Sequence, residues 1–204
     1  TKQSKTVSSQ SLERSLLLIN GLPGANIAGV NITPGRESAT SNFIVETQKT
    51  SRISGFLMGD NYGSSYTGRN RLMGGVDLNS PFSMGDKISL SGLVTNGQDL
   101  KNFRLSYSSL LAPNGLIGEM AVRTSYELTD DFAPLEALGT AEIAEVSLSY
   151  PFALTRALSI HGGLNIGYRS LTDKIRSIES EVPKTAIVMN PSLSFSFADD
   201  FFGL

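Results

Sequence analysis

The chain has 204 residues, of which 18% are charged and 40% are hydrophobic, and its formal net charge is -2. This balance argues against a basic nucleic-acid-binding protein and against a charge-rich disordered tail. Because the sequence contains no cysteine, it excludes a disulfide framework, a cysteine-ligated metal and a thiol nucleophile.

The apolar runs are too short for a transmembrane helix. The longest, residues 16–19, stops at Asn20, whereas a membrane-spanning helix needs ~18 apolar residues or more. The chain opens with TKQSK and has neither an initiator methionine nor an apolar signal core behind it. We therefore expect it to be an internal piece of a longer precursor that crosses no membrane by helices.

The first predicted element is an amphipathic helix of about three turns. Three apolar residues recur at helical spacing: Leu12, Leu16 and Ile19. Ser8 or Ser9 can cap its N-terminus, Gly21 fits the left-handed position after its end, and Pro23 prevents it from continuing.

Two short strands follow the helix, over residues 25–33 and 42–49, with a turn at Pro34-Gly35 between them. A helix on a sheet of this size would be marginally stable alone, so we expect more of the domain upstream of Thr1.

From Arg52 the sequence shows strand alternation and no further helix signal. Eight strands are predicted, over residues 52–59, 68–79, 87–95, 102–111, 115–129, 142–152, 158–170 and 185–198. Asn96-Gly97 and Asn114-Gly115 lie where hairpin turns are needed, which predicts antiparallel pairing.

The strand over residues 115–129 has the most regular alternation. One face carries apolar and aromatic residues: Met120, Val122, Thr124, Tyr126 and Leu128. The other face carries small and charged residues: Ala121, Arg123, Ser125 and Glu127. Ordinary strands have about 5–6 residues, but a tilted strand that crosses a bilayer needs roughly 9–11, and this one is long enough. We predict a mainly β fold, in which an antiparallel meander forms part of a transmembrane β-barrel.

The connections between the predicted strands differ in length. Short ones lie near residues 80–86, 112–115 and 153–157, and the longest are predicted at 129–141 and 171–183. Outer-membrane barrels place short turns in the periplasm and longer loops outside. With the N-terminal region in the periplasm, the first barrel strand runs outward and the long loops fall on the outer side.

The sequence offers little for catalysis, and we predict no enzyme activity, no cofactor and no metal site. It has no GxSxG, HExxH or P-loop motif. A single histidine, with no cysteine in the chain, cannot supply a set of three histidine or cysteine metal ligands. The adjacent carboxylates at 130–131 and 199–200 suit turns better than calcium sites. Four polar residues are predicted to face a barrel lumen: Arg104, Arg123, Glu127 and His161.

Several segments resemble one known family. They are LERSLLLINGLPG at 12–24, DNYGSSYTGRNR at 60–71, YEL at 126–128 with FAPLEALG at 132–139, and LSYPF at 148–152. In this order they are similar to the two-partner secretion transporters, the hemolysin and hemagglutinin activation/secretion family of the outer membrane. The family's plug helix, first POTRA domain, pore loop and terminal aromatic strand have no match.

The resemblance implies that residues 1–50 are the C-terminal part of a periplasmic POTRA domain, and that residues 51–204 are the first half of a transmembrane β-barrel. It implies a pore in the bacterial outer membrane that secretes a partner exoprotein, adhesin-like or hemolysin-like, without ATP. The implied partners are this protein in unfolded form and outer-membrane lipid, with no nucleic acid and no small-molecule substrate.

A POTRA sheet edge can accept an extended client strand through backbone hydrogen bonds. The candidate residues for such an edge are Ile27, Val30, Phe43 and Val45. Two alternatives stay open from the sequence. One is a complete eight-stranded outer-membrane barrel, and the other is a soluble β-sandwich binding module.

Overall fold

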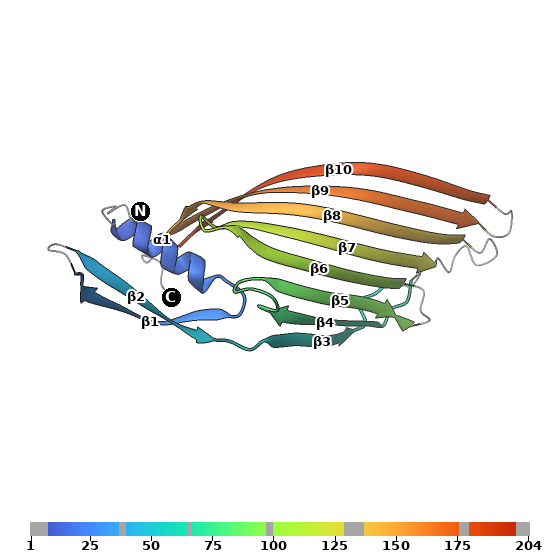
Figure 1. Cartoon of the computed structure of the whole chain (residues 1–204). Coiled ribbons are helices and arrows are strands. Elements are labelled where there is room, and N and C mark those ends of the chain that lie inside the picture. The colour runs from blue at the N-terminus through green and yellow to red at the C-terminus, as the bar shows by residue number, and fades with distance from the viewer. Residues whose placement is uncertain are drawn as a thin grey trace.

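The computed structural model describes residues 8–36, 40–64, 67–96, 100–128, 137–175 and 180–198. The elements in chain order are α1 (Ser9–Asn20), β1 (Ala25–Pro34), β2 (Ser41–Lys49), β3 (Ile53–Asp60), β4 (Arg71–Asn79), β5 (Lys87–Thr95), β6 (Leu100–Ala112), β7 (Leu116–Leu128), β8 (Ala137–Leu154), β9 (Leu158–Ile175) and β10 (Ser180–Phe197). They form a two-stranded sheet, β1-β2, and an eight-stranded sheet in the order β10 to β3 (Figure 1).

Helix α1 begins as predicted and ends differently. The side-chain oxygen of Ser8 accepts a hydrogen bond from the backbone N–H of Ser11 at 3.2 Å, so Ser8 is the N-cap. Gly21 is right-handed, with φ −82, because its N–H still donates to the Leu17 carbonyl as in a helical turn. The left-handed residue is Gly24, with φ 81, so the prediction for Gly21 was wrong.

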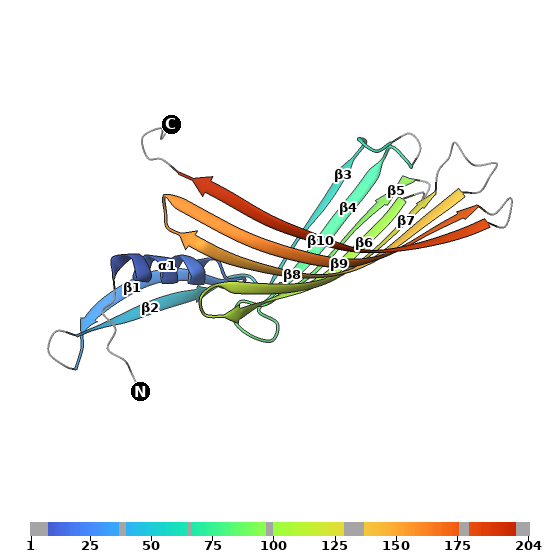
Figure 2. The same cartoon turned by 90° about the horizontal axis from the view of Figure 1, so that it is seen from above.

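The eight-stranded sheet is a simple antiparallel meander in which every strand pairs with its neighbours in sequence. The short turns, at 80–86, 113–115 and 155–157, lie at the end that meets α1 (Figure 1). The sheet is strongly curved and twisted, and β1, β2 and α1 lie together at one end of it, with α1 beside the ends of β8 and β9 (Figure 2). The predicted mainly β, antiparallel fold is confirmed.

The last three strands are longer than predicted, with 18 residues each. A strand of this length spans roughly 60 Å, about twice the ~30 Å hydrocarbon core, so its end lies in water. Charged residues therefore fit inside the strands there, and Lys174 pairs with Glu181 and Lys184 with Asp173 across β9 and β10. The prediction of a long loop over residues 171–183 was wrong, because charged residues occur in the solvated end of a strand as well as in loops.

The sheet does not close on itself. β3 and β10 are the two ends of the strand order and do not pair in the described part of the chain. This contradicts the alternative of a complete eight-stranded barrel. The alternative of a sandwich is also wrong, because the eight strands form one continuous sheet rather than two sheets packed face to face.

The two faces of this sheet carry opposite kinds of residues. The outer face is defined by an apolar row that the strand register makes continuous: Val76, Leu90, Leu105, Val122, Ala144, Tyr168 and Ile187. The inner face holds the alternate residues, and it is the more covered one. In β7, Val122 on the outer face is 54% exposed, whereas its neighbour Ala121 on the inner face is 6% exposed.

Little apolar surface is buried within the chain. Among the described residues, the only buried hydrophobic ones are Ala25 and Ala121. The accessible surface is 14453 Å², whereas a compact monomer of this mass exposes roughly 9,300 Å². No described helix has the length and apolar character to span a membrane. Large apolar side chains of the outer face, Leu90 and Val122 among them, are exposed, as they are on the lipid-facing side of a membrane-spanning sheet.

Candidate functional site

The inner face of the sheet is the candidate functional surface, and a cluster of charges lies at its centre. The Arg104 guanidinium on β6 donates from Nη2 to Glu119 on β7 at 2.5 Å and from Nη1 to Glu145 on β8 at 3.0 Å. Long side chains from three strands meet here because they project from the same face of a curved sheet. Arg104 thus pairs with two carboxylates and offsets one of their two negative charges, on a face otherwise rich in serine and glycine.

Arg123 also lies on the inner face, directly opposite Arg104 in the register of β6 and β7. Arg169 lies on the same row, with Ile143 between it and Arg123. Neither Arg123 nor Arg169 makes a hydrogen bond or ion pair with the described residues, and the Arg169 Nε atom is buried without a partner. The inner face therefore has unpaired positive charge.

The other two predicted lumen residues lie away from this cluster. His161 on β9 is half-buried and faces Pro151 and Ser194 in register, near the end of the sheet that meets α1. It lines a cleft of about 460 Å³ between α1 and the sheet. Glu127 pairs in register with Leu100, but its side chain lies outside the described part of the structure.

Helix α1 is attached to the short turns of the sheet by polar contacts. Arg14 donates from Nη2 to the carbonyls of Asn114 and Pro151, at 3.2 and 2.5 Å, and its guanidinium lies 5.9 Å from the centre of the Tyr150 ring. Glu13 accepts a hydrogen bond from the Arg156 backbone N–H at 2.9 Å. The two charged residues of the helix therefore reach two different turns.

Glycines in the turns allow the helix region to approach closely. A Cβ atom on Gly115, where φ is 95, would lie 2.6 Å from Leu18 Cδ2. A Cβ atom on Gly85, where φ is 90, would lie 2.9 Å from Leu22 Cδ2. Both positions need glycine for the backbone conformation and for the contact, so these turns are shaped to receive α1 and the segment after it.

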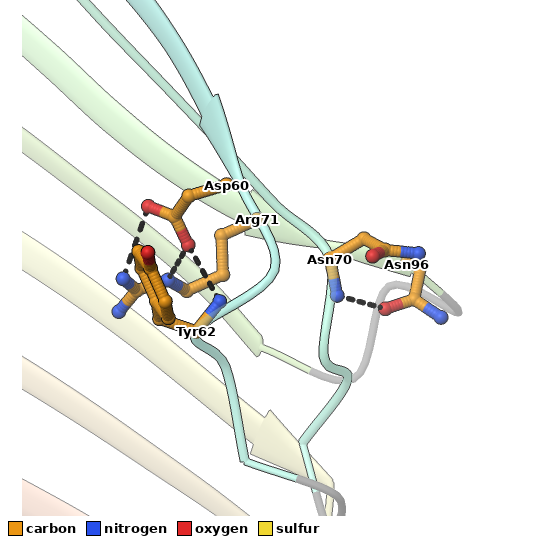
Figure 3. A network of polar contacts seen from close by, with 5 residues as sticks. All are labelled: Asp60, Tyr62, Asn70, Arg71 and Asn96. Atoms are coloured by element: carbon orange, nitrogen blue, oxygen red, sulfur yellow. Dashed lines mark hydrogen bonds and ion pairs between the residues drawn. The ribbon is translucent and has the colours of Figure 1, made fainter.

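A second polar network lies at the opposite end of the sheet, where β3 ends and β4 begins (Figure 3). Arg71 binds the Asp60 carboxylate with two hydrogen bonds, at 2.7 and 3.0 Å, and the Tyr62 backbone N–H donates to the same carboxylate at 3.0 Å. Nearby, the Asn96 side-chain oxygen accepts from the Asn70 backbone N–H at 2.8 Å. The segment 60–71 is thus held to the strands at both of its ends.

The four residues predicted for a client-binding edge lie in the β1-β2 pair. Val30 faces Val45 in register, and Phe43 faces Ile32. A bulge between Ile27 and Gly29 shifts Ile27 by one position, so it shares a face with Val30, Val45 and Phe43. β1 and β2 pair only with each other in the described residues, so each has a second backbone edge.

Several functional residues were not predicted from the sequence. Glu119 shares the alternating phase of Arg123, and Arg169 shares that of His161, so the periodicity would have placed both on the inner face. The pairing of Asp60 with Arg71, and the contacts of Arg14, gave no sequence signal because they depend on strand register and docking. No group of three metal-ligating side chains occurs among the described residues, and the carboxylates at 130–131 and 199–200 lie outside them.

The outer apolar face, the polar inner face and the helix fixed at the short turns define a class, the β-barrel proteins of the outer membrane. Comparison of the sequence with known families gives the same result. Residues 39–126 match the family described as haemolysin secretion/activation protein ShlB/FhaC/HecB. The match covers less than half of the chain, and it confirms the resemblance predicted from the sequence.

Known relatives agree with this assignment. The heme/hemopexin transporter protein HuxB of Haemophilus influenzae (strain 86-028NP) is 30% identical over 168 residues, which are 82% of this chain and 30% of HuxB. The chain therefore spans less than a third of that relative's length. The relatives are transporters, which agrees with the prediction that the chain is not an enzyme.

Two solved structures have the same fold. CdiB from Escherichia coli superposes with a TM-score of 0.79 at 16% identity and covers 97% of this chain and 38% of its own. CdiB from Acinetobacter baumannii gives a TM-score of 0.63 at 14% identity and covers 96% and 41%. Family and fold together confirm the predicted location in the outer membrane.

Proposed function

We propose that the protein is a pore that secretes a partner exoprotein, adhesin-like or hemolysin-like, from the periplasm across the outer membrane without ATP. The observation that carries this proposal is the eight-stranded sheet, which has an apolar outer face, a polar inner face and a helix fixed at its short turns. An interior of this kind suits passage of a polypeptide, whose peptide groups need polar partners throughout.

The partner travels in unfolded form in this proposal. An extended chain exposes its backbone N–H and C=O groups, and a lumen lined by serine, glycine and charged residues leaves those groups hydrated. The matched family is described by secretion and activation of haemolysin, and the name of HuxB assigns it heme/hemopexin transport. Both descriptions support a secreted protein as the cargo of this chain.

The two parts of the chain have separate roles in the proposal. Residues 1–50 form the C-terminal part of a POTRA domain, and residues 51–204 form the first half of the barrel. The second edge of β1 or β2 accepts an extended segment of the partner by strand addition, with backbone hydrogen bonds for affinity. Ile27, Val30, Phe43 and Val45 lie on one face of this pair and contact the partner's alternate side chains.

Two experiments test the proposal. Deletion of the gene should abolish release of the exoprotein encoded beside it into the medium, and the full-length gene should restore release. In proteoliposomes that contain the purified full-length protein, the unfolded partner added on the POTRA side should become protected from protease without added ATP. Continued release by the deletion strain, or a requirement for ATP in the liposomes, would contradict the proposal.

A further inference from the structure

The inner face carries three arginines at one level of the sheet. Arg104 on β6 pairs in register with Arg123 on β7, Arg123 with Ile143 on β8, and Ile143 with Arg169 on β9. Adjacent strands are about 4.8 Å apart, so the backbones of Arg123 and Arg169 are separated by about 10 Å. We call these three residues the arginine row.

Only one member of the arginine row is neutralised. Arg104 has two carboxylate partners, Glu119 and Glu145. Arg123 lies directly opposite Arg104, an arrangement of like charges that destabilises a strand pair. Glu145 is the diagonal neighbour of Arg169, but its carboxylate is bound to Arg104.

The remaining two arginines have donors without acceptors in the described part of the chain. Arg169 is half-buried, and its Nε–H is shielded from water without a hydrogen-bond partner. Most buried donors in native structures have a partner, and an unsatisfied one marks a place where a partner is missing. A pair of like charges and a buried donor without a partner are both unfavourable for stability. Native proteins retain such arrangements mainly at functional sites.

We propose that Arg123 and Arg169 bind side-chain carboxylates of a polypeptide that lies against the inner face. The planar guanidinium presents N–H groups in a fork that fits a carboxylate, and it stays charged at every physiological pH. This proposal rests on the proposed function, because it takes the ligand to be a polypeptide in the pore.

The acidic residues of the cluster lie nearer to α1 than the arginine row does. Glu145 is in register with Ala121, one level closer to the short turns than Arg123, and Glu119 lies one level further still. A chain that enters from the α1 end therefore passes a level that carries carboxylates before it reaches the free arginines. The carboxylates of the first level repel acidic side chains of the entering chain, and the free arginines of the second level bind them. Once an acidic side chain has passed the first level, the same repulsion opposes its return.

Single-channel recording of the full-length protein in a planar bilayer tests this site. The probes are a peptide of alternating Asp and Gly and a matched peptide of alternating Asn and Gly, added on the α1 side. The Asp peptide should block wild-type channels at least about tenfold longer than the Asn peptide, because a hydrogen bond from a guanidinium to a carboxylate is roughly twice as strong as one between neutral groups. The double variant Arg123→Gln/Arg169→Gln should lose this difference.

The matched control removes the same charge elsewhere. In Arg52→Gln/Arg69→Gln, two exposed arginines outside the arginine row are replaced, and the difference between the peptides should remain. Arg123→Lys/Arg169→Lys keeps the charge but removes the fork, so it should retain an intermediate difference. A discrete conductance step in each variant, whatever its size, shows that the pore has formed, whether or not it secretes a partner.

The recordings also distinguish two sources of the carboxylate. A block by the Asp peptide that depends on the arginine row assigns the site to the exported chain. A second outcome is that wild-type channels do not discriminate between the peptides, and that the channel open time rises in Arg123→Gln/Arg169→Gln but in no other variant. The carboxylate then belongs to another segment of the protein's own chain. If the arginine-row and control variants behave alike in both respects, the proposal is wrong.

Discussion

The body of the eight-stranded sheet and the end that meets α1 are stabilised in different ways. In the body, large apolar side chains are exposed on the outer face, and the strand register alone keeps them on that face. At the α1 end, buried residues gather as they do in a soluble protein. They are Ala25, Gly85, Asp86, Gly115 and Pro151.

The turn between β4 and β5 illustrates the second kind of stabilisation. The side chain of Asp86 is fully buried, and one of its carboxylate oxygens accepts from the backbone N–H groups of Phe82 and Ser83 and from the Tyr107 hydroxyl. Ser80 donates to the Pro23 carbonyl, which joins this turn to the segment after α1. The outer face of the body therefore has large apolar side chains left exposed by the described residues, whereas the α1 end is held by specific polar and packing contacts.

A charge on the outer face of the body should have the largest effect. Leu90→Arg places a guanidinium in the middle of the apolar row, at a side chain that is 54% exposed to the surroundings. An arginine at the bilayer midplane costs about 2–4 kcal/mol, so the unfolding free energy in lipid should fall by that amount. Urea titration of the full-length protein in vesicles, followed by heat-modifiable gel migration, measures it.

The control for this substitution is the preceding residue. Ser89 lies on the inner face of β5, opposite Asp77, so Ser89→Arg adds the same group to the polar side. Its effect should stay below about 1 kcal/mol, in the usual range of a substitution away from a packed core. An equal loss of unfolding free energy in the two variants would mean that the outer and inner faces are not in different surroundings, lipid and water.

An added methyl group in a turn at the α1 end should have the next largest effect. In Gly115→Ala, the new Cβ would lie 2.6 Å from Leu18 Cδ2 and 2.8 Å from Pro151 Cγ, at a residue whose φ is 95. The left-handed conformation and the overlap together should cost about 2–3 kcal/mol. The measurement is the urea midpoint of the full-length protein.

Gly21→Ala is the matched control for that change. Gly21 has a right-handed backbone, and a Cβ there would lie 3.4 Å from the nearest atom, the Leu17 carbonyl oxygen. This substitution should stabilise the protein slightly, by about 0.4–1 kcal/mol, because it restricts the unfolded chain. A similar destabilisation in both variants would show that the fit between Leu18 and Gly115 has no special importance.

The sequence was sufficient to predict features that depend on local periodicity. Alternation along 115–129 predicted both faces of β7, and the spacing of Leu12, Leu16 and Ile19 predicted α1. Such patterns are visible because a strand repeats every two residues and a helix every 3.6. The family resemblance added the outer-membrane location.

Features that depend on contacts between distant residues were not predictable. Arg104 meets Glu145, 41 residues away, and Arg14 meets the Pro151 carbonyl, 137 residues away. Each contact requires that the register or the docking of α1 is already known. The charged segment 171–183 was predicted as a loop because periodicity does not distinguish a solvated strand end from a loop.

Removal of the helix guanidinium should weaken the α1 end more moderately. Arg14→Ala deletes the hydrogen bonds to the carbonyls of Asn114 and Pro151, which are worth about 1–2 kcal/mol after allowance for a half-buried group. Hydrogen exchange of residues 9–20 in the full-length protein should accelerate about five- to thirtyfold. Arg36→Ala, at an exposed arginine in the β1-β2 connection, should leave this exchange unchanged.

The smallest effect is expected at the far end of the sheet, where Asp60 and Arg71 meet. Asp60→Asn removes the charge that accepts from Arg71 and from the Tyr62 backbone N–H, so the segment 61–70 should be cut a few-fold faster by an added protease. The change is small because this ion pair reaches water, which weakens exposed ion pairs.

Asp77→Asn, at a carboxylate without an ion pair among the described residues, should leave the cleavage rate unchanged. The exchanged pair Asp60→Arg/Arg71→Asp should recover part of the protection, and failure to recover any would show that the network depends on the backbone contact at Tyr62 rather than on the ion pair.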